Sequence, residues 1–312
     1  MTEVNDRREA GMVAPYVLHM ITPLANVSPF DVNMAVDAGI DTVVPYTGIE
    51  TAQVEALTQD AMFSRDPKNA ARTGLFIGGR DAAMALDMLD VARKAMFPPF
   101  QISVFADPSG AFTTAAAMVA VVERALRRAG LDGMTGLDVQ VYGATGVVGG
   151  IAGLIAAQAG GTVTLVSHRG VSAVQGKAEE FGRRYGVTLS CADTASAGKA
   201  DLLDRAEVVL ACGKAGITVL SAEDLRAAGR LRVAADINAV PPAGVEGVGV
   251  QDDGVALPTA SGAVGIGALA IGNVKFKVQH HLLERMQSSG TAVAFDFRDA
   301  MDAARTIAGK AS

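Results

Sequence analysis

Short apolar runs alternate with segments of helical periodicity along the first 130 residues. Four runs predict β-strands, at residues 16–20, 42–45, 74–78 and 101–105. Three segments carry apolar residues at helical spacing and predict helices, at 50–62, 80–96 and 112–129. A further helix is expected to begin at Ser28-Pro29, because serine is a favoured N-cap and proline a favoured first helical residue. Strands that alternate with helices predict a parallel sheet covered on both faces.

A second series of strands and helices follows the glycine-rich stretch 130–136, which is the expected domain boundary. Its strands are predicted at 137–142, 162–167, 187–190, 207–211 and 231–236, and its helices at 147–160, 172–185, 197–204 and 263–287. The amphipathic segment 297–309 is expected to pack back onto the first domain. The predicted organisation is a flexible N-terminus (1–15), an N-terminal α/β domain (16–132), a second α/β domain (133–287) and a C-terminal helical segment (288–312).

The composition excludes several classes of protein. Lys plus Arg is 27 and Asp plus Glu is 33, so a net charge of −6 offers no basic surface for a nucleic-acid backbone. No run of about 18 apolar residues predicts a membrane span, and no signal peptide is recognised. The two cysteines and four histidines form no metal-binding motif. We therefore expect no bound metal and a cytoplasmic location.

The clearest motif is a glycine-rich turn between a predicted strand and a predicted helix. The strand that begins at Val139 runs into G-x-x-G-x-x-G, a variant of the dinucleotide fingerprint. Glycines permit a tight turn and close approach to a pyrophosphate, and the helix N-terminus adds partial positive charge. This predicts a Rossmann-type domain; the alternative is a glycine-rich turn with no ligand. The predicted cofactor-binding residues of the turn are Gly143, Ala144, Thr145, Gly146, Val147, Val148 and Gly149.

The end of the next strand indicates which dinucleotide binds. NAD sites usually place a carboxylate about 20 residues beyond the glycines, to hold the ribose 2′-hydroxyl. Here the strand ends in Ser167-His168-Arg169, without a carboxylate. Arginine and serine suit a 2′-phosphate, so NADP is favoured. The alternative is that Arg169 is a solvated loop residue and NAD is also accepted.

Two later strand ends are also expected to face the cofactor, because ligands bind outside the carboxyl ends of parallel strands. Small residues there would let the ribose and nicotinamide approach the backbone. The predicted contacts are Cys212, Gly213, Asn238 and Ala239, and Gly267 is expected to let the long predicted helix approach the cofactor or the neighbouring domain. Cys212 has no histidine or asparagine placed beside it by sequence, so we interpret it as an ordinary thiol.

The acid–base residues of common dehydrogenases are missing. A short-chain dehydrogenase would carry Tyr-x-x-x-Lys, but Tyr185 is followed four residues later by Leu189. Hydride transfer that needs little proton transfer fits this absence. Oxidation of a carbon held between two nitrogens is such a reaction, because the nitrogen lone pairs stabilise the developing cation. We therefore assign no catalytic residue and expect catalysis by positioning.

Long stretches of the chain resemble the NAD(P)-dependent methylene-tetrahydromethanopterin dehydrogenases of methylotrophic bacteria. They include LHMITPLANVSPFDVNMAVDAGIDTVVPYTG (18–48), LTQDAMFSR (57–65), RTGLFIGGRDA (72–82), VFADPSGAFTTAAAMVAVV (104–122), GATGVVG (143–149), DINAVPPAGV (236–245) and VGIGALAIGNVKFK (264–277). The resemblance implies oxidation of N5,N10-methylene-tetrahydromethanopterin to the methenyl form with reduction of NAD(P)+, in formaldehyde oxidation. It also implies two α/β domains with the pterin in a cleft between them, and we expect a homo-oligomer. The alternatives are methylene-tetrahydrofolate oxidation, dihydromethanopterin reduction with NADPH, or NADP binding without turnover.

The resemblance also suggests substrate-binding residues, each with a structural alternative. Phe30 would pack on the pterin ring or belong to the core. Asp31 or Asp37 would bind the pterin's amidine edge, although Asp31 also suits the first turn of a helix. The remaining candidates are Asp107 (otherwise a turn residue), Thr113 (otherwise a helix cap) and Lys275 (otherwise a surface lysine).

Overall fold

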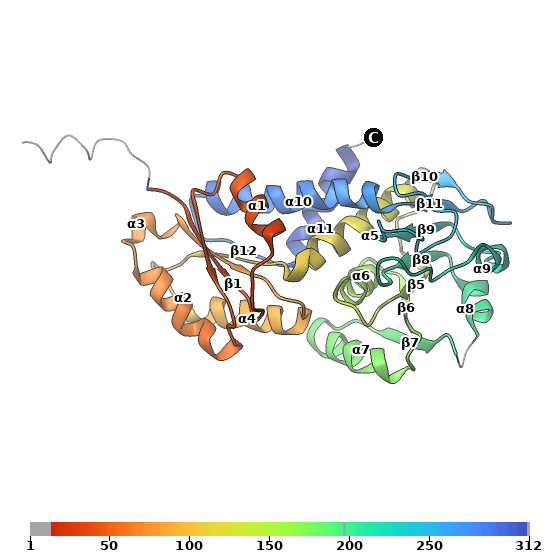
Figure 1. Cartoon of the computed structure of the whole chain (residues 1–312), viewed down its shortest axis with the longest axis horizontal. Coiled ribbons are helices and arrows are strands. Elements are labelled where there is room, and N and C mark those ends of the chain that lie inside the picture. Colours follow the sequence, from red (N-terminus) through yellow and green to blue (C-terminus); the bar gives the residue numbers. More distant parts are fainter. Residues whose placement is uncertain (1–13, 196–197, 311–312) are drawn as a thin grey trace, which may run out of the picture. The chain divides into compact units, whose positions relative to one another are not determined.

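Residues 14–195 and 198–310 are described by a computed structural model of the chain, drawn in Figure 1. By residue contacts the chain divides into two units. Unit 1 contains the chain up to Gly79, Ala83–Ala106 and His280–Phe295. Unit 2 contains Arg80–Ala82, Asp107–Gln279 and the chain from Asp296 onward. Most of the expected flexible N-terminus (1–15) lies outside the described residues.

Unit 1 is built on a five-stranded parallel sheet with the strand order β12-β4-β3-β1-β2. The strands are β1 (Val17–Ile21), β2 (Thr42–Tyr46), β3 (Thr73–Ile77), β4 (Ser103–Ala106) and β12 (Ala294–Phe295). Its helices are α1 (Pro29–Asp37), α2 (Val54–Phe63), α3 (Pro67–Ala70) and α4 (Ala82–Ala95), the last of which begins within unit 2. All five residues of β3 are buried, as expected for an inner strand of a parallel sheet covered on both faces.

Unit 2 is built on a seven-stranded sheet with the order β10-β11-β9-β8-β5-β6-β7. Its strands are β5 (Asp138–Tyr142), β6 (Thr162–Ser167), β7 (Leu189–Asp193), β8 (Val208–Ala211), β9 (Val233–Asp236), β10 (Asp253–Ala256) and β11 (Val264–Ile266). Strand β10 is antiparallel to β11, and the other pairs are parallel. Without β10, the order is that of the dinucleotide-binding Rossmann fold. The α/β prediction with a Rossmann-type domain is confirmed.

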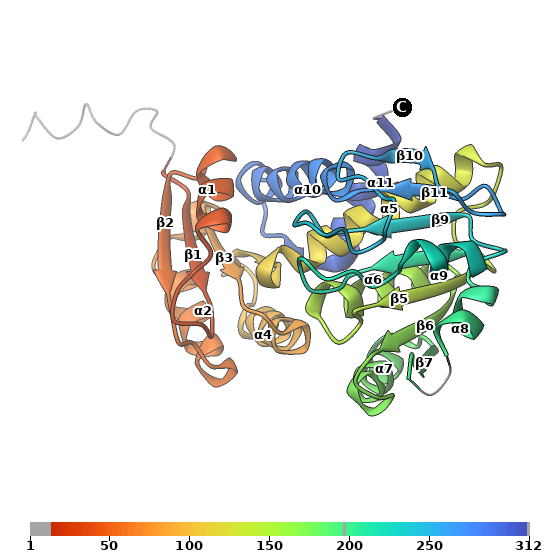
Figure 2. The same ribbon diagram turned by 45° about the vertical axis from the view of Figure 1, so that its right-hand side comes forward.

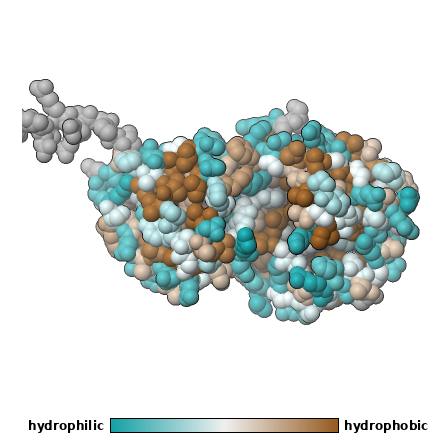
Figure 3. All heavy atoms as spheres, in the orientation of Figure 1, coloured by the Kyte–Doolittle hydropathy of each residue, from teal (hydrophilic) through white to brown (hydrophobic). Residues whose placement is uncertain are grey.

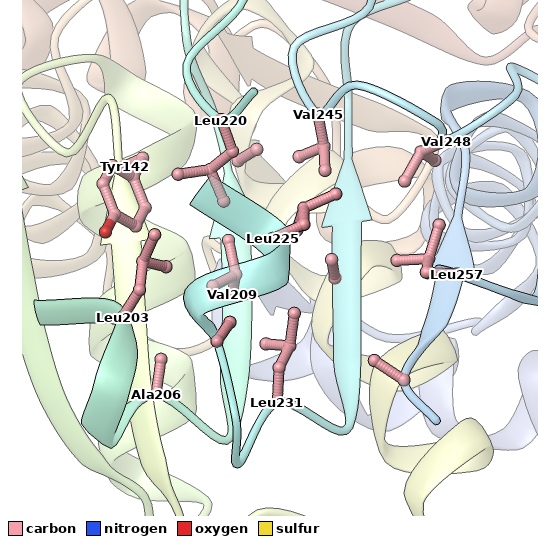
Figure 4. Close-up of a cluster of buried hydrophobic side chains, with 14 of the residues drawn as sticks. Tyr142, Leu203, Ala206, Val209, Leu220, Leu225, Leu231, Val245, Val248 and Leu257 are labelled. Atoms are coloured by element: carbon pink, nitrogen blue, oxygen red, sulfur yellow. The ribbon is translucent and has the colours of Figure 1, made fainter. Parts of the chain in front are cut away.

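Helices cover this sheet on both faces (Figure 2). The helices of unit 2 are α5 (Ala111–Arg128), α6 (Val147–Gln158), α7 (Ser172–Tyr185), α8 (Lys199–Arg205), α9 (Ala222–Ala227) and α11 (Phe297–Lys310), and α10 (Ala268–Ser288) begins in unit 2 and continues into unit 1 from His280. Under α8 and α9, a cluster of buried side chains joins helices and sheet, including Leu203, Val209 and Leu225 (Figure 4). Each fully buried leucine there contributes about 2 kcal/mol of hydrophobic stabilisation.

The packing of helix α5 explains why the boundary between the two units differs from the predicted domain boundary. This helix is rich in alanine and valine and buried on nearly all sides, and it packs against both α6 and α11. The helix therefore belongs to unit 2, and the division falls at 106/107 instead of the expected 132/133. The C-terminal helix α11 packs on α5 as well, and so also belongs to unit 2.

The expected single helix over 263–287 is wrong at its beginning. Residues Val264–Ile266 form strand β11 beside β9, and helix α10 begins at Ala268. Gly267 lies between them, where a Cβ would be 2.0 Å from the carbonyl oxygen of Gly249. This close backbone approach separates the strand from the helix.

On the surface, hydrophilic residues are spread over the visible faces of both units, with hydrophobic patches between them (Figure 3). Among the described helices, none is long and apolar enough to cross a membrane.

Candidate cofactor and substrate site

The turn between β5 and α6 is built from glycines that admit no side chain. Gly143 has a φ of +76°, and a Cβ there would lie 2.2 Å from the carbonyl oxygen of Cys212. A Cβ on Gly149 would lie 2.7 Å from the carbonyl oxygen of Gly143, so this glycine lets α6 pack against the turn. Gly146 is the N-cap of α6. The turn thus presents its backbone and a helix N-terminus, the arrangement that binds phosphate groups.

A cavity of ≈ 770 Å³ lies at this turn, at the carboxyl ends of β5, β6 and β8. That volume is within the range of ligand pockets. It is lined by Tyr142, Gly143, Thr145, Gly146, Val147, Val148, Val166, Ser167, His168, Arg169, Thr194, Lys199, Cys212, Gly213, Lys214, Ile217, Thr218, Val219 and Ile237. The predicted residues of the glycine turn, of 167–169 and of 212–213 are therefore brought together, apart from Ala144 and Gly149.

Several predicted cofactor contacts do not line this cavity. Ala144 is fully buried, and Gly149 lies behind the turn. Asn238 Oδ1 accepts the N–H groups of Gly216 (3.2 Å) and Val240 (2.9 Å), so its side chain joins two loops. Two further predicted residues also lie outside the lining: exposed Ala239 and tightly packed Gly267.

The end of β6 carries the groups expected to select the cofactor. The Arg169 guanidinium donates to Thr145 Oγ1 (3.1 Å), so it reaches the glycine turn. Ser167 Oγ accepts the backbone N–H of Arg169 (3.0 Å). No carboxylate lines the cavity among the described residues, whereas Arg169, Lys199 and Lys214 do. This balance favours a ligand with several phosphate groups.

Two of these cations are absent from the sequence prediction. Lys214 follows the end of β8 by three residues, and proximity to a strand end is a signal that could have identified it. Lys199 begins α8 and is paired with Asp224 at 3.0 Å. Its place at the cavity depends on how α8 packs, which has no signature in the local sequence.

Cys212 lines the cavity as a protonated thiol. Burial raises its pKa to about 12, and the charge of Asp236 acts in the same direction. Its Sγ lies 3.6 Å from Met118 Sδ. A thiol that stays protonated at neutral pH is a poor nucleophile, consistent with its interpretation as an ordinary thiol.

A second cluster in unit 2 gathers three predicted substrate residues. Asp107 is fully buried and accepts the N–H groups of Phe112 (2.9 Å) and Thr113 (3.2 Å) and the hydroxyl of Thr113 (2.7 Å). Lys275 lies against the same turn, because a Cβ on Gly110 would be 3.0 Å from its Nζ.

Neighbouring groups and burial shift the pKa of Asp107 in opposite directions. Burial raises the pKa of Asp107, while the charge of Lys275 and the hydrogen bonds from Thr113 and Phe112 lower it. The Lys275 ammonium also donates to Gln279 Oε1. A carboxylate and an ammonium thus lie together at one turn, and both oxygens of Asp107 accept hydrogen bonds from the chain itself, as the structural alternative of a turn residue predicts.

The other predicted substrate residues belong to helix α1 of unit 1. Phe30 is 48% exposed, so it is not the core residue of the structural alternative. Asp31 is buried in the first turn, in the position that a helix N-terminus favours. Asp37 ends the helix, and its carbonyl group contacts His280 Nε2 at 3.2 Å. Their binding roles stay predictions. In the described part of the chain, no cluster of side chains could hold a metal ion.

The strand order and the glycine-turn cavity together define a Rossmann-type dinucleotide-binding protein. A solved structure shares the fold: the NAD-dependent malic enzyme of Thermotoga maritima matches with a TM-score of 0.56 at 13% identity, over 94% of this chain and 84% of that one.

Two sequence relatives identify the family. An NAD(P)-dependent methylenetetrahydromethanopterin dehydrogenase of Methylorubrum extorquens is 47% identical over 95% of this chain and 100% of its own length. Bifunctional protein MdtA of the same organism is 30% identical over 91% of this chain and 96% of its own length. A family model described as methylene-tetrahydromethanopterin dehydrogenase, N-terminal, matches residues 29–109. The chain belongs to the methylene-tetrahydromethanopterin dehydrogenase family.

Proposed function

We propose that this protein oxidises N5,N10-methylene-tetrahydromethanopterin to the methenyl form and reduces NAD(P)+ in the same step. The observation that carries the proposal is the end-to-end similarity to a dehydrogenase of that name. The cavity at the glycine turn adds a physical basis, since its backbone and cations suit a dinucleotide. When bound there, the nicotinamide accepts the hydride.

NADP is the preferred cofactor, and NAD is also accepted. Arg169 and Ser167 stand at the strand end that meets the adenosine ribose in Rossmann domains. With no carboxylate in the described lining, nothing there would repel a 2′-phosphate. The Arg169 guanidinium, which donates to the Thr145 hydroxyl at this end of the cavity, has donors suited to that phosphate.

On the substrate side, Asp107 and Lys275 bind and orient the pterin. The carboxylate accepts hydrogen bonds from the amidine edge of the ring, and the ammonium donates to its carbonyl or tail. Thr113 holds the carboxylate in place through its hydroxyl. Phe30, Asp31 and Asp37 remain candidates for further contacts with the pterin.

The reaction depends on the relative position of the pterin and nicotinamide rings more than on proton transfer. The carbon that loses the hydride lies between two nitrogens, whose lone pairs stabilise the resulting cation. No proton has to leave that carbon, so no side chain acts as a base. The residues named above bring the two rings together, and such orientation accounts for a large part of a rate enhancement.

Steady-state kinetics with purified protein test the proposal. Methylene-tetrahydromethanopterin with NADP should give the highest kcat/KM, followed by the same pterin with NAD. Methylene-tetrahydrofolate and dihydromethanopterin are the comparison substrates. A higher kcat/KM with either of them, or cofactor binding without any turnover, would contradict the assignment.

Two further expectations accompany this function. We propose that the protein is a homo-oligomer, which light scattering after gel filtration would measure. We also propose a cytoplasmic location, consistent with the absence of a membrane-crossing helix among the described residues. Cell fractionation would test that location.

A further inference from the structure

Lys177 of α7 lies behind the glycine turn. Its ammonium donates to three successive carbonyls of the turn, those of Ala144 (3.0 Å), Thr145 (3.1 Å) and Gly146 (2.9 Å). A lysine ammonium has three N–H donors, and these three hydrogen bonds use all of them. Lys177 does not line the cavity. Its role must therefore operate through the turn and not through contact with a ligand.

The three hydrogen bonds fix the direction of the peptide groups in the turn. In a planar trans peptide, the carbonyl and the N–H of the following residue point in opposite directions. Carbonyls turned toward Lys177 therefore direct the N–H groups of Thr145 and Val147, both lining residues, away from it. The intervening N–H, of Gly146, bonds to the carbonyl of Gly143 at 3.0 Å.

Gly150 leaves the space that the lysine side chain needs. A Cβ on Gly150 would lie 2.6 Å from Lys177 Cδ and 2.9 Å from its Nζ. Gly150 lies in α6, one residue beyond the G-x-x-G-x-x-G motif. Its lack of a side chain is thus explained by Lys177, independently of the fingerprint.

We infer that Lys177 is a positioning residue of the cofactor site, which holds the phosphate-binding turn in its binding conformation and places a positive charge behind it. This inference deepens the proposed function, because it concerns the same cofactor site. The charge acts on the pyrophosphate, which NAD and NADP share. Arg169 by contrast is proposed to act on the 2′-phosphate, which only NADP carries.

The net pKa of Lys177 is lowered, because its partial burial outweighs the nearby negative charges. Burial lowers the pKa of Lys177, while the charges of Asp81 and Glu180 raise it. Holding the ammonium there costs desolvation free energy, which its carbonyl bonds and these carboxylates offset.

Four variants test the inference: Lys177→Met, Lys177→Ala, Gly150→Ala and the double variant Lys177→Ala/Gly150→Ala. Lys177→Met keeps an unbranched side chain that is shorter by one atom and removes the ammonium. Its Kd for NADPH and for NADH, measured by nicotinamide fluorescence, should rise by a similar factor of about ten or more. At saturating cofactor, kcat and the KM for the pterin should stay within about twofold of wild type, because the turn does not contact the pterin.

A double-mutant cycle separates the lysine from general packing. Gly150→Ala should weaken cofactor binding in the wild-type protein but have little further effect once Lys177 is alanine. Gly176→Ala is the matched control, because it adds a methyl group to the neighbouring position of α7, where nothing lies within 4 Å. Circular dichroism and thermal melting verify that each variant is folded.

The outcomes distinguish this inference from the proposed function. Unchanged cofactor affinity in folded Lys177→Met, or an effect on NADPH alone, would overturn the role of Lys177. Fully additive effects of Gly150→Ala and Lys177→Ala would do the same. Tight cofactor binding to the wild type without pterin oxidation would contradict the proposed function and leave the role of Lys177 standing.

Discussion

Two strand-to-helix turns of this protein share a left-handed glycine but differ in what meets the N-terminus of the helix that follows. The turn that leads into α6 and the turn that leads into α5 each contain a glycine in the left-handed region, Gly143 (φ +76°) and Gly110 (φ +64°). At α6, the N-cap is Gly146, no side-chain hydrogen bond caps the helix among the described residues, and a cavity lies beside the helix start. At α5, the Asp107 carboxylate accepts the N–H groups of the first turn.

The difference shows how one chain can bind an anion at one helix N-terminus and use another helix N-terminus to hold its own carboxylate. An open helix N-terminus suits an anion that arrives with the ligand. A helix N-terminus that already holds a carboxylate has no such use, and its second oxygen bonds the hydroxyl of Thr113. Lys275 lies beside this turn, where we propose that the pterin ring binds. Four predictions would break or sharpen this comparison.

The largest effect is expected from Gly143→Ala. The new Cβ would lie 2.2 Å from the carbonyl oxygen of Cys212, and φ is unfavourable for any side chain. Cofactor affinity should fall by roughly 100-fold or more. Gly136→Ala is the control, since it has a similar φ of +74° but no neighbour within 4 Å. Calorimetry measures the cofactor affinity of both variants. Equal losses would show that the close approach of Gly143 to the Cys212 carbonyl is not needed for cofactor binding.

Asp107→Asn should affect the substrate and not the cofactor. The amide keeps the shape of the side chain but loses its charge and one acceptor. We expect kcat/KM for the pterin to fall about 100-fold, because a charge-assisted pair of hydrogen bonds is lost. The Kd for NADPH, measured on the same protein, should not change. A weaker cofactor affinity with normal pterin kinetics would reverse the roles of the two turns.

Arg169→Ala should change cofactor selectivity. Loss of the guanidinium should raise the KM for NADP about tenfold or more and leave the KM for NAD almost unchanged. The control is Arg183→Ala, which removes an exposed arginine that does not line the cavity. Equal effects of Arg169→Ala on both cofactors would remove the assignment of NADP to this end of the cavity.

The smallest expected effect is on stability. Burial raises the pKa of Asp107 in the folded protein, so the stabilising contribution of its protonated form is present at acidic pH and is lost as pH rises through that raised pKa. The stability of Asp107→Asn relative to wild type should therefore increase as pH rises above about 4, the ordinary pKa of an aspartate. Urea unfolding at several pH values measures this difference. A difference that decreases with rising pH would mean that the ionised carboxylate is net stabilising.

Local patterns in the chain were sufficient for most of the elements and for part of the lining of the cofactor cavity. The glycine turn was predicted from an apolar strand, three spaced glycines and an apolar helix, because each of those features has a local physical cause. Ser167 and Arg169 followed from the position of the next strand end. Asp107 was proposed from its resemblance to a family motif.

Other features depend on contacts between distant segments. The carbonyl of Cys212 that excludes a side chain at Gly143 comes from another strand. Lys275 reaches the Asp107 turn from α10, more than 160 residues along the chain. Lys177 was not predicted, since an isolated lysine in an amphipathic helix is typical of a solvent-exposed face.

The assignment of α5 has the same explanation. Its alanines and valines allow burial on every side, but a local pattern does not state which partner covers each side. The helices that cover α5 are α6 and α11, which lie later in the chain. Periodicity and the spacing of glycines are properties of neighbours in sequence, so they were available from the residues alone. Packing partners and buried charges are properties of neighbours in space, and they became known only when the chain was folded.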